Sequence, residues 1–253
     1  MQTQIKTASE ITAMRESGRM LATVLNHLKT VIIPGMTTKD LANIAAEKLK
    51  SLGNGQPSFL GYQGFPDVIC VSINEEVVHG IPSKHKIIND GDIVGLDFGV
   101  TYKDMITDAA ISVIVGRPKQ RGHIQLLADT EEALNRGIAA IHDQVRTGDI
   151  GSAIEGYLKK RRYGIVQDLV GHGVGHALHE DPNIPNYGRA NTGPWLSKGM
   201  TIAIEPMVTL GTDRVKVADD GWTVLTADNS RSAHFEHTVL ITENGAEILT
   251  QLG

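Results

Sequence analysis

The sequence predicts an α+β fold of two similar helix–helix–strand halves around a central antiparallel sheet. Three observations support this prediction. Apolar residues recur at helical spacing between positions 11 and 49, and short β-like runs follow between positions 68 and 115. The same order of patterns then begins again near position 123. Two units of this length favour a pseudo-twofold duplication, because solenoid repeats have much shorter periods.

The first half begins with two helices. Thr7 and Glu10 have the spacing of a capping box, in which each side chain binds the backbone N–H of the other residue. Apolar residues at helical spacing continue to Leu28, and a Pro-Gly pair at 34–35 ends the helix. A second helix is expected over residues 37–53.

Strands are expected next, over residues 68–73, 93–101 and 105–115. The last two runs flank a short turn at 102–104, so they should form a hairpin. The first and second halves should therefore each supply strands to one sheet.

The second half repeats this order with a helix over 123–145 and another from Ile150 that ends near Gly164. Superposing Asp149 on Asp40 aligns the two second helices at an offset of 109 residues. No linker separates the halves, so residues 1–253 are expected to form a single domain. The notable loop is expected at 180–198, where its length indicates a functional role.

Composition places the chain among soluble globular proteins, with 41% hydrophobic residues, 21% charged residues and a net charge of −5. This charge argues against nucleic acid as the main partner. No apolar stretch could span a bilayer, and the amino terminus lacks the apolar segment of a signal peptide. With a single cysteine, Cys70, the chain is expected to be cytoplasmic.

Acidic side chains within apolar or glycine-rich strand-like segments are the strongest functional signal. Burying a lone carboxylate costs several kcal/mol unless something compensates. Two divalent cations would balance the formal charge of four carboxylates, and one histidine completes an oxygen-rich set. The candidate ligands are Asp97, Asp108, His172, Glu205 and Glu236.

Each of these residues also has a structural interpretation. Asp97 precedes Phe-Gly and fits a turn, Asp108 fits a strand end, and Glu205 precedes a proline that could mark a strand end. A second alternative is a mononuclear zinc site formed by His172, His176 and His179. The glycines between these histidines argue against a helix that would align them.

Five segments together resemble the type I methionine aminopeptidases of the short bacterial kind. They are NEEVVHGIP (74–82), LDFGVTYKDMITDAA (96–110), GHGVGHALHEDPNIPN (171–186), TIAIEPMV (201–208) and SAHFEHTVLIT (232–242). The resemblance implies the pita-bread fold and removal of the initiator methionine from nascent proteins and peptides, preferentially when the second residue is small. It also implies two divalent metal cations, which could be Mn, Fe, Co or Zn.

The resemblance also implies roles for individual residues. Asp97, Asp108, His172, Glu205 and Glu236 would hold the metals, and a metal-bridged hydroxide would attack the peptide carbonyl. Glu205 would move protons, His179 would stabilise the carbonyl oxygen and His79 would contact the scissile amide. The methionine pocket would draw on Phe59, Tyr62, Phe65, Cys70, Leu178 and Trp222.

The chain departs from familiar members of this family at Phe59, Leu178 and His234, where Cys, Phe or Met, and Gln are common. The shape of the pocket is the property that these differences affect. A proline-directed aminopeptidase of the same fold and a peptide-binding protein without catalysis are the competing interpretations. A monomer is expected, with no membrane partner and with a transient ribosome contact through the basic run at 159–163 as an open alternative.

Overall fold

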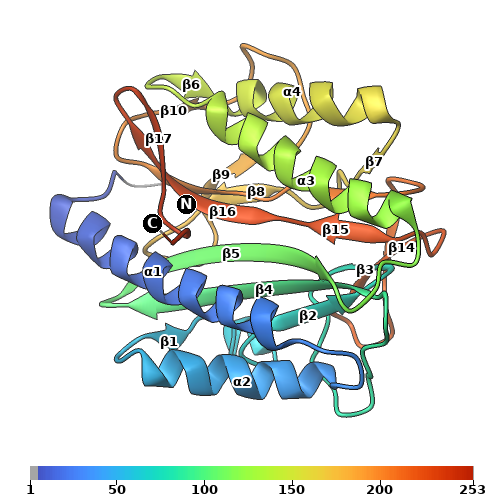
Figure 1. Ribbon diagram of the computed structural model, residues 1–253. Helices are drawn as coiled ribbons and strands as arrows, with labels where there is room; N and C mark the ends of the chain where they lie inside the picture. The colour runs from blue at the N-terminus through green and yellow to red at the C-terminus, as the bar shows by residue number, and fades with distance from the viewer. Residues whose placement is uncertain (1–4, 253) are drawn as a thin grey trace.

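The computed structural model of the protein describes residues 5–252 (Figure 1). Residues 1–4, which begin the amino-terminal stretch expected to lack a signal segment, lie outside the described residues, as does residue 253. The described helices are α1 (Ala8–Val31), α2 (Thr38–Ser51), α3 (Arg121–Ala139) and α4 (Thr147–Leu158), with short 3-10 helices η1 (Tyr62–Gly64) and η2 (Lys159–Arg161). Within residues 5–252, no helix has the length and apolar character needed to cross a membrane.

A nine-stranded antiparallel sheet forms the centre of the fold. Its strands follow the order β1-β4-β5-β16-β11-β8-β9, with β2 also paired to β4 and β17 paired to β16. Their bounds are β1 (Gln56–Pro57), β2 (Cys70–Ile73), β4 (Ile93–Tyr102), β5 (Met105–Ile114), β8 (Gly171–Gly173), β9 (Glu180–Ile184), β11 (Thr201–Ile204), β16 (Glu236–Thr242) and β17 (Gly245–Ile248).

Three smaller sheets lie around this one. They contain β6 (Val145–Arg146) with β10 (Trp195–Leu196); β7 (Gly164–Ile165), β12 (Met207–Thr209) and β15 (Ser232–His234); and β3 (Glu76–Val78), β13 (Val215–Val217) and β14 (Val224–Thr226).

The two halves meet where β5 pairs with β16 in the central sheet. The aspartates aligned by the sequence offset occupy equivalent positions at the starts of α2 and α4. Asp40 Oδ2 accepts the Thr37 N–H at 2.8 Å, and Asp149 Oδ2 accepts the Arg146 N–H at 2.9 Å. The expected capping box of α1 is also present, with the Thr7 N–H donating to Glu10 Oε2 at 2.7 Å.

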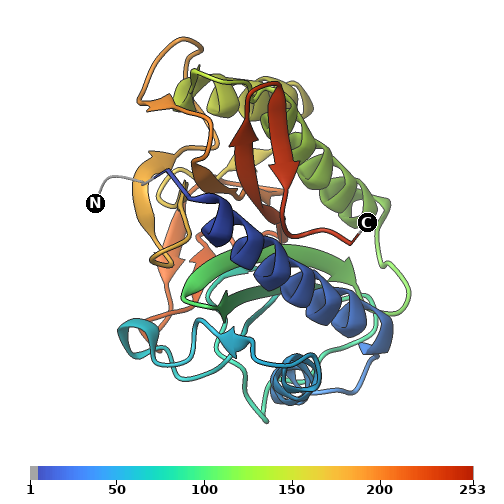
Figure 2. The same cartoon turned by 90° about the vertical axis from the view of Figure 1, so that its left-hand side faces the viewer.

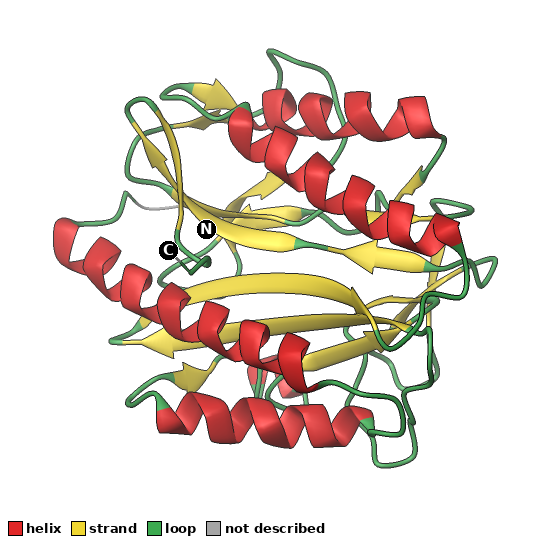
Figure 3. Ribbon diagram, in the orientation of Figure 1, coloured by secondary structure: helices red, strands yellow, loops and turns green. Residues whose placement is uncertain are grey.

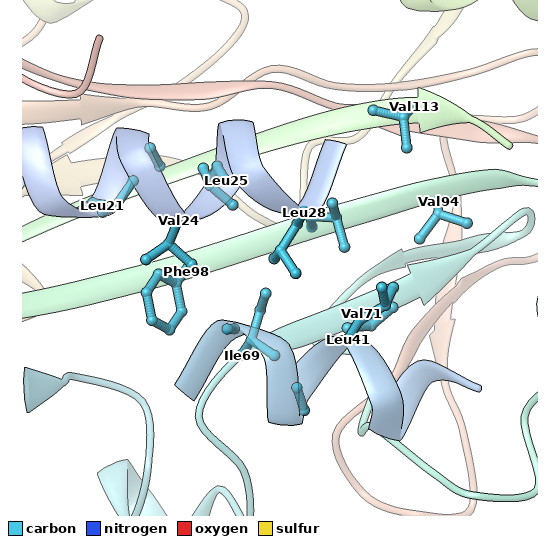
Figure 4. Close-up of a cluster of buried hydrophobic side chains, with 14 of the residues drawn as sticks. Leu21, Val24, Leu25, Leu28, Leu41, Ile69, Val71, Val94, Phe98 and Val113 are labelled. Atoms are coloured by element: carbon cyan, nitrogen blue, oxygen red, sulfur yellow. The ribbon is translucent and has the colours of Figure 1, made fainter. Parts of the chain in front are cut away.

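Helices pack against one face of the sheet, as Figures 1 and 3 show for α1 and α3. The largest core cluster lies between α1, α2 and the strands of the first half (Figure 4). On β4, the residues that enter this cluster alternate with the others, because successive side chains of a strand point to opposite faces. They are Val94, Leu96, Phe98 and Val100. Asp97 therefore points to the opposite face, away from the helices.

Two of the expected boundaries were wrong. The helix expected over 123–145 ends at Ala139, because Val145 pairs with Leu196 in a small sheet. The expected loop at 180–198 contains β9 and β10. The first difference arises from pairing with a segment distant in sequence, which short-range spacing does not encode. The second arises because β9 pairs with the neighbouring β8, and neither strand has the alternation of apolar residues that marks a strand.

Leu28 is fully buried in the cluster under α1, so Leu28→Ala should lower the free energy of unfolding by about 2–5 kcal/mol through lost burial and a residual cavity. Chemical denaturation measures this change. Leu60→Ala, at a position 55% exposed, is the matched control and should change stability by less than about 0.5 kcal/mol. Equal losses in both variants would contradict the assigned core.

Candidate metal centre and substrate pocket

The register of the sheet places the candidate acidic ligands of the first half on one face. Asp97 pairs with Ala110, and Gly99 pairs with Asp108. Paired residues share a face of a sheet, as do residues two apart on one strand. Ala110 also pairs with Glu236 of β16. The two aspartates and Glu236 therefore point to the same side, opposite the helices.

The second half supplies His172 and Glu205 to this face by the same rule. Ala203 of β11 pairs with His172 on one side and with Thr238 on the other. Thr238 is two residues from Glu236, and Glu205 is two residues beyond Ala203 at the end of β11. All five candidate ligands are thus brought together by strands from both halves.

The side chains converge closely enough to bind a metal ion. Ligand atoms of Asp108, His172 and Glu236 all lie within 4.8 Å of one another, and all three residues are buried. His172 Nε2 lies 3.4 Å from Glu205 Oε1. Oδ1 of Asp97, Oδ1 of Asp108 and Oε1 of Glu236 are buried without a hydrogen-bond partner within residues 5–252. Acceptors without donors in such a cluster fit divalent cations.

Electrostatics lead to the same conclusion. Burial raises the pKa of Asp97 to about 7, with the charge of Glu205 adding to the effect. Burial and the neighbouring carboxylates raise the pKa values of Asp108 and Glu236 well above their usual range. A divalent cation would reverse these shifts, because it favours the ionised carboxylates.

Glu205 differs from the other acidic residues. Burial alone would raise its pKa, but contact with His234 and the nearby imidazoles lowers it below the usual value. The structure places His234 Nε2 3.5 Å from Glu205 Oε2 and 3.9 Å from Glu236 Oε2. From the sequence, His234 was expected to affect the shape of the pocket, and its contact with Glu205 and Glu236 was not predicted. Its spacing of two residues from Glu236 was the available signal.

A pocket opens beside the carboxylates. Its volume is about 140 Å³, and all six residues expected for the methionine pocket line it: Phe59, Tyr62, Phe65, Cys70, Leu178 and Trp222. Phe65 meets Phe59 and Trp222 in edge contacts, with ring centroids 6.5 and 5.2 Å apart. Gln63 also lines the pocket, which the sequence did not indicate because it lies in an exposed turn with a positive φ.

Two imidazoles line the same pocket. Burial and then the nearby His172 lower the pKa of His179 to about 4, so its ring is neutral at ordinary pH. The Tyr62 hydroxyl lies 2.8 Å from His179 Nδ1. With that hydroxyl as donor, the ring proton lies on Nε2, where it can donate to a ligand. Burial also lowers the pKa of His79, whose backbone has a φ of 59°.

The three-histidine zinc site is not assembled. His172 and His179 lie close together, with ring centroids 4.2 Å apart. The side chain of His176 is 36% exposed, and its Nε2 lies 2.8 Å from Glu10 Oε1 at the start of α1. The third imidazole therefore contacts a different element.

Comparison with known proteins gives a family model and relatives that agree with a metal-binding site in a peptidase. The model of metallopeptidase family M24 matches residues 12–243. The methionine aminopeptidase of Mycoplasma capricolum is 46% identical over 98% of both chains, and methionine aminopeptidase 1 of Bacillus subtilis is 45% identical over 98% of both.

Solved structures confirm the expected pita-bread fold. A methionine aminopeptidase from Thermotoga maritima has a TM-score of 0.96, with 48% identity over 99% of this chain and 100% of that one. A prolidase from Pyrococcus furiosus has a TM-score of 0.78, with 26% identity over 98% of this chain and 66% of that one. From the match of the family model and from these relatives, we conclude that the chain belongs to metallopeptidase family M24.

Proposed function

We propose that this protein hydrolyses the peptide bond after the N-terminal methionine of nascent proteins and peptides, preferentially when the second residue is small. One observation carries the proposal: a buried acidic cluster borders an apolar pocket of about 140 Å³. Such a pocket holds one unbranched apolar side chain and places the following peptide bond beside the cluster. The similarity to methionine aminopeptidases along almost the whole chain supports the same activity.

The proposed cofactor is a pair of divalent cations held by Asp97, Asp108, His172, Glu205 and Glu236. Four carboxylates and one imidazole suit Mn²⁺, Fe²⁺, Co²⁺ or Zn²⁺, and two such ions balance the carboxylate charge. When bound, divalent cations lower the pKa of water and so provide a nucleophile near neutral pH.

The remaining chemistry belongs to the side chains of this protein. Glu205, whose pKa lies below its usual value, is ionised and can accept a proton at a carboxylate oxygen and pass it to the leaving amine. Neutral His179 donates a hydrogen bond to the substrate carbonyl oxygen and stabilises its developing negative charge. His79 lies across the pocket against Trp222 and contacts the scissile amide nitrogen.

The proposed setting of this activity is the cytoplasm, where the protein acts as a monomer and as a single catalytic domain over residues 1–253. Pairing of β5 with β16 supports one catalytic unit, because it joins the halves in a single sheet. Transient ribosome contact through residues 159–163 is a further part of the proposal. Lys159 is paired with Glu155 and Arg161 with Asp129, so part of this charge is already neutralised within the chain.

Replacing Asp108 by Ala should abolish both metal binding and turnover. The carboxylate has a ligand atom within 4.8 Å of those of His172 and Glu236, and its loss leaves less charge to balance two cations. Calorimetric titration with Co²⁺ under anaerobic conditions and a Met-Ala-Ser cleavage assay test this prediction. Asp219→Ala, at an exposed position, is the control. Normal activity of the Asp108 variant would refute the dinuclear site.

His179→Ala should lower kcat by about 10²-fold or more with metal content preserved, since losing one oxyanion donor costs about 3 kcal/mol. His176→Ala, from the same turn, should keep its metal and have a much smaller effect on kcat, because its exposed contact with Glu10 contributes little. Metal analysis and steady-state kinetics distinguish the two variants. Loss of metal from His179→Ala would instead make His179 a ligand.

A panel of Xaa-Ala-Ser tripeptides, with Mn²⁺ or Co²⁺ supplied, tests the substrate. Met should be preferred, and charged or β-branched first residues should be excluded from the apolar pocket. Norleucine should be a poorer substrate rather than an inert one, because one methylene changes binding by about 1–3 kcal/mol. Leu178→Phe should change KM more than metal content, since Leu178 lines the pocket. A preference for Lys, Glu or Xaa-Pro peptides would overturn the methionine assignment and leave a metallohydrolase.

A further inference from the structure

Lys6 is a buried cation close to the amino terminus. Its side chain has no exposed surface, and its Nζ lies 2.7 Å from Glu180 Oε2, which is also buried. The Lys6 N–H donates to the Gly199 carbonyl at 2.8 Å, so the backbone is fixed as well. Figure 2 shows the chain entering α1 beside the yellow-orange strand of the second half. A buried charge is tolerated when it is paired, and here the partner is 174 residues away.

Glu180 also organises the turn between β8 and β9. Its Oε1 accepts the N–H groups of His176 at 2.6 Å and Ala177 at 3.0 Å. Gly175 has a φ of 147°, and a Cβ at this position would overlap Lys6 Cε. The turn is therefore folded around one carboxylate, and the lysine stem packs directly against its glycine.

This turn carries two residues of the proposed site. Leu178 packs in the apolar cluster of pocket residues that also contains Phe59, Phe65 and Cys70, and His179 immediately precedes Glu180. Backbone pairing in the sheet holds His172 through Ala203, whereas residues 174–179 lie between the strands. The ladder thus fixes the candidate metal ligand. Backbone hydrogen bonds of Val174 and Gly175 hold the start of the turn, and the side chains of Lys6 and Glu180 hold the part that follows, where Oε1 of Glu180 accepts two N–H groups.

We infer that Lys6 and Glu180 are positioning residues that set the placement of His179 and Leu178, separately from the metal ligands. The inference rests on the proposed function, since it assigns these two residues to that site. It makes residues 5–7, which precede α1, part of the catalytic framework, although no side chain of these three residues lines the pocket.

Lys6→Met tests the inference, because methionine keeps an unbranched apolar stem and removes the ammonium. Arg15→Met is the matched control, since it removes the exposed ion pair between α1 and Glu247. Three measurements apply to both variants and to the wild type. They are kcat and KM for Met-Ala-Ser, Co²⁺ affinity by calorimetry, and NMR of labelled histidine rings with His237 as internal reference.

Lys6→Met should lower kcat by about tenfold or more and raise KM, since small displacements of a catalytic group have large effects on rate. Its Co²⁺ affinity and the His237 signals should match the wild type, while the His179 signals shift. Arg15→Met should match the wild type throughout. If Lys6 only stabilised the fold, kcat would fall in proportion to the folded fraction, while KM and the His179 signals would stay unchanged. That result would overturn the inference. A parallel loss of Co²⁺ affinity would also overturn it.

Two further conditions keep the test decisive. If Lys6→Met does not fold, Lys6→Gln takes its place, because an amide can still donate to Glu180. A smaller change in kcat, KM and the His179 signals is then expected. No change in these quantities would contradict the inference. If the wild type fails to cleave Met-Ala-Ser, the proposed function is wrong. The His179 signals would still report whether Lys6 positions the turn.

Discussion

The concentration of acidic side chains in the middle of a sheet is the constraint on which the rest of the structure depends. Asp97, Asp108 and Glu236 converge on one face, where burial makes their ionised forms unfavourable, and Glu205 lies beside them with its ionised form favoured by nearby imidazoles. Because the helices pack on the other face, the carboxylates do not compete with the apolar core for space. Any charge that they carry has to be balanced within the cluster, so the fold itself creates a group of side chains able to bind a cation.

The same region combines strong charge with apolar and neutral groups. His79 and His179 have lowered pKa values because they are buried, so they enter the site as neutral hydrogen-bonding groups. Aromatic rings meet at their edges in the lining of the pocket beside the cluster. Under the proposed function, this arrangement separates two tasks, since the face of the sheet carries the charge and the residues around the pocket recognise the substrate side chain.

Local signals in the sequence predicted much of this arrangement. The capping box at Thr7 and the aspartates at 40 and 149 determine helix starts through contacts within three residues, so spacing alone reveals them. The candidate ligand residues were identifiable because ionisable groups are unusual in apolar strands. The sequence did not predict β9, the end of α3 or the contact between His234 and Glu205. The end of α3 and the contact of His234 depend on pairing between distant segments, as does the burial of Lys6. β9 pairs with the neighbouring β8, but few apolar residues mark either strand.

The hairpin of β4 and β5 closes through Lys103 and Asp104, both with positive φ, and pairs Tyr102 with Met105. Its register sets Asp97 and Asp108 diagonally across two strands on one face. Inserting or deleting one residue between them would turn one carboxylate to the helix-covered face, because side chains alternate along a strand. During evolution, the segment between Asp97 and Asp108 can therefore change in composition far more readily than in length. Insertions and deletions in this hairpin should be removed by selection even where substitutions in the turn are neutral.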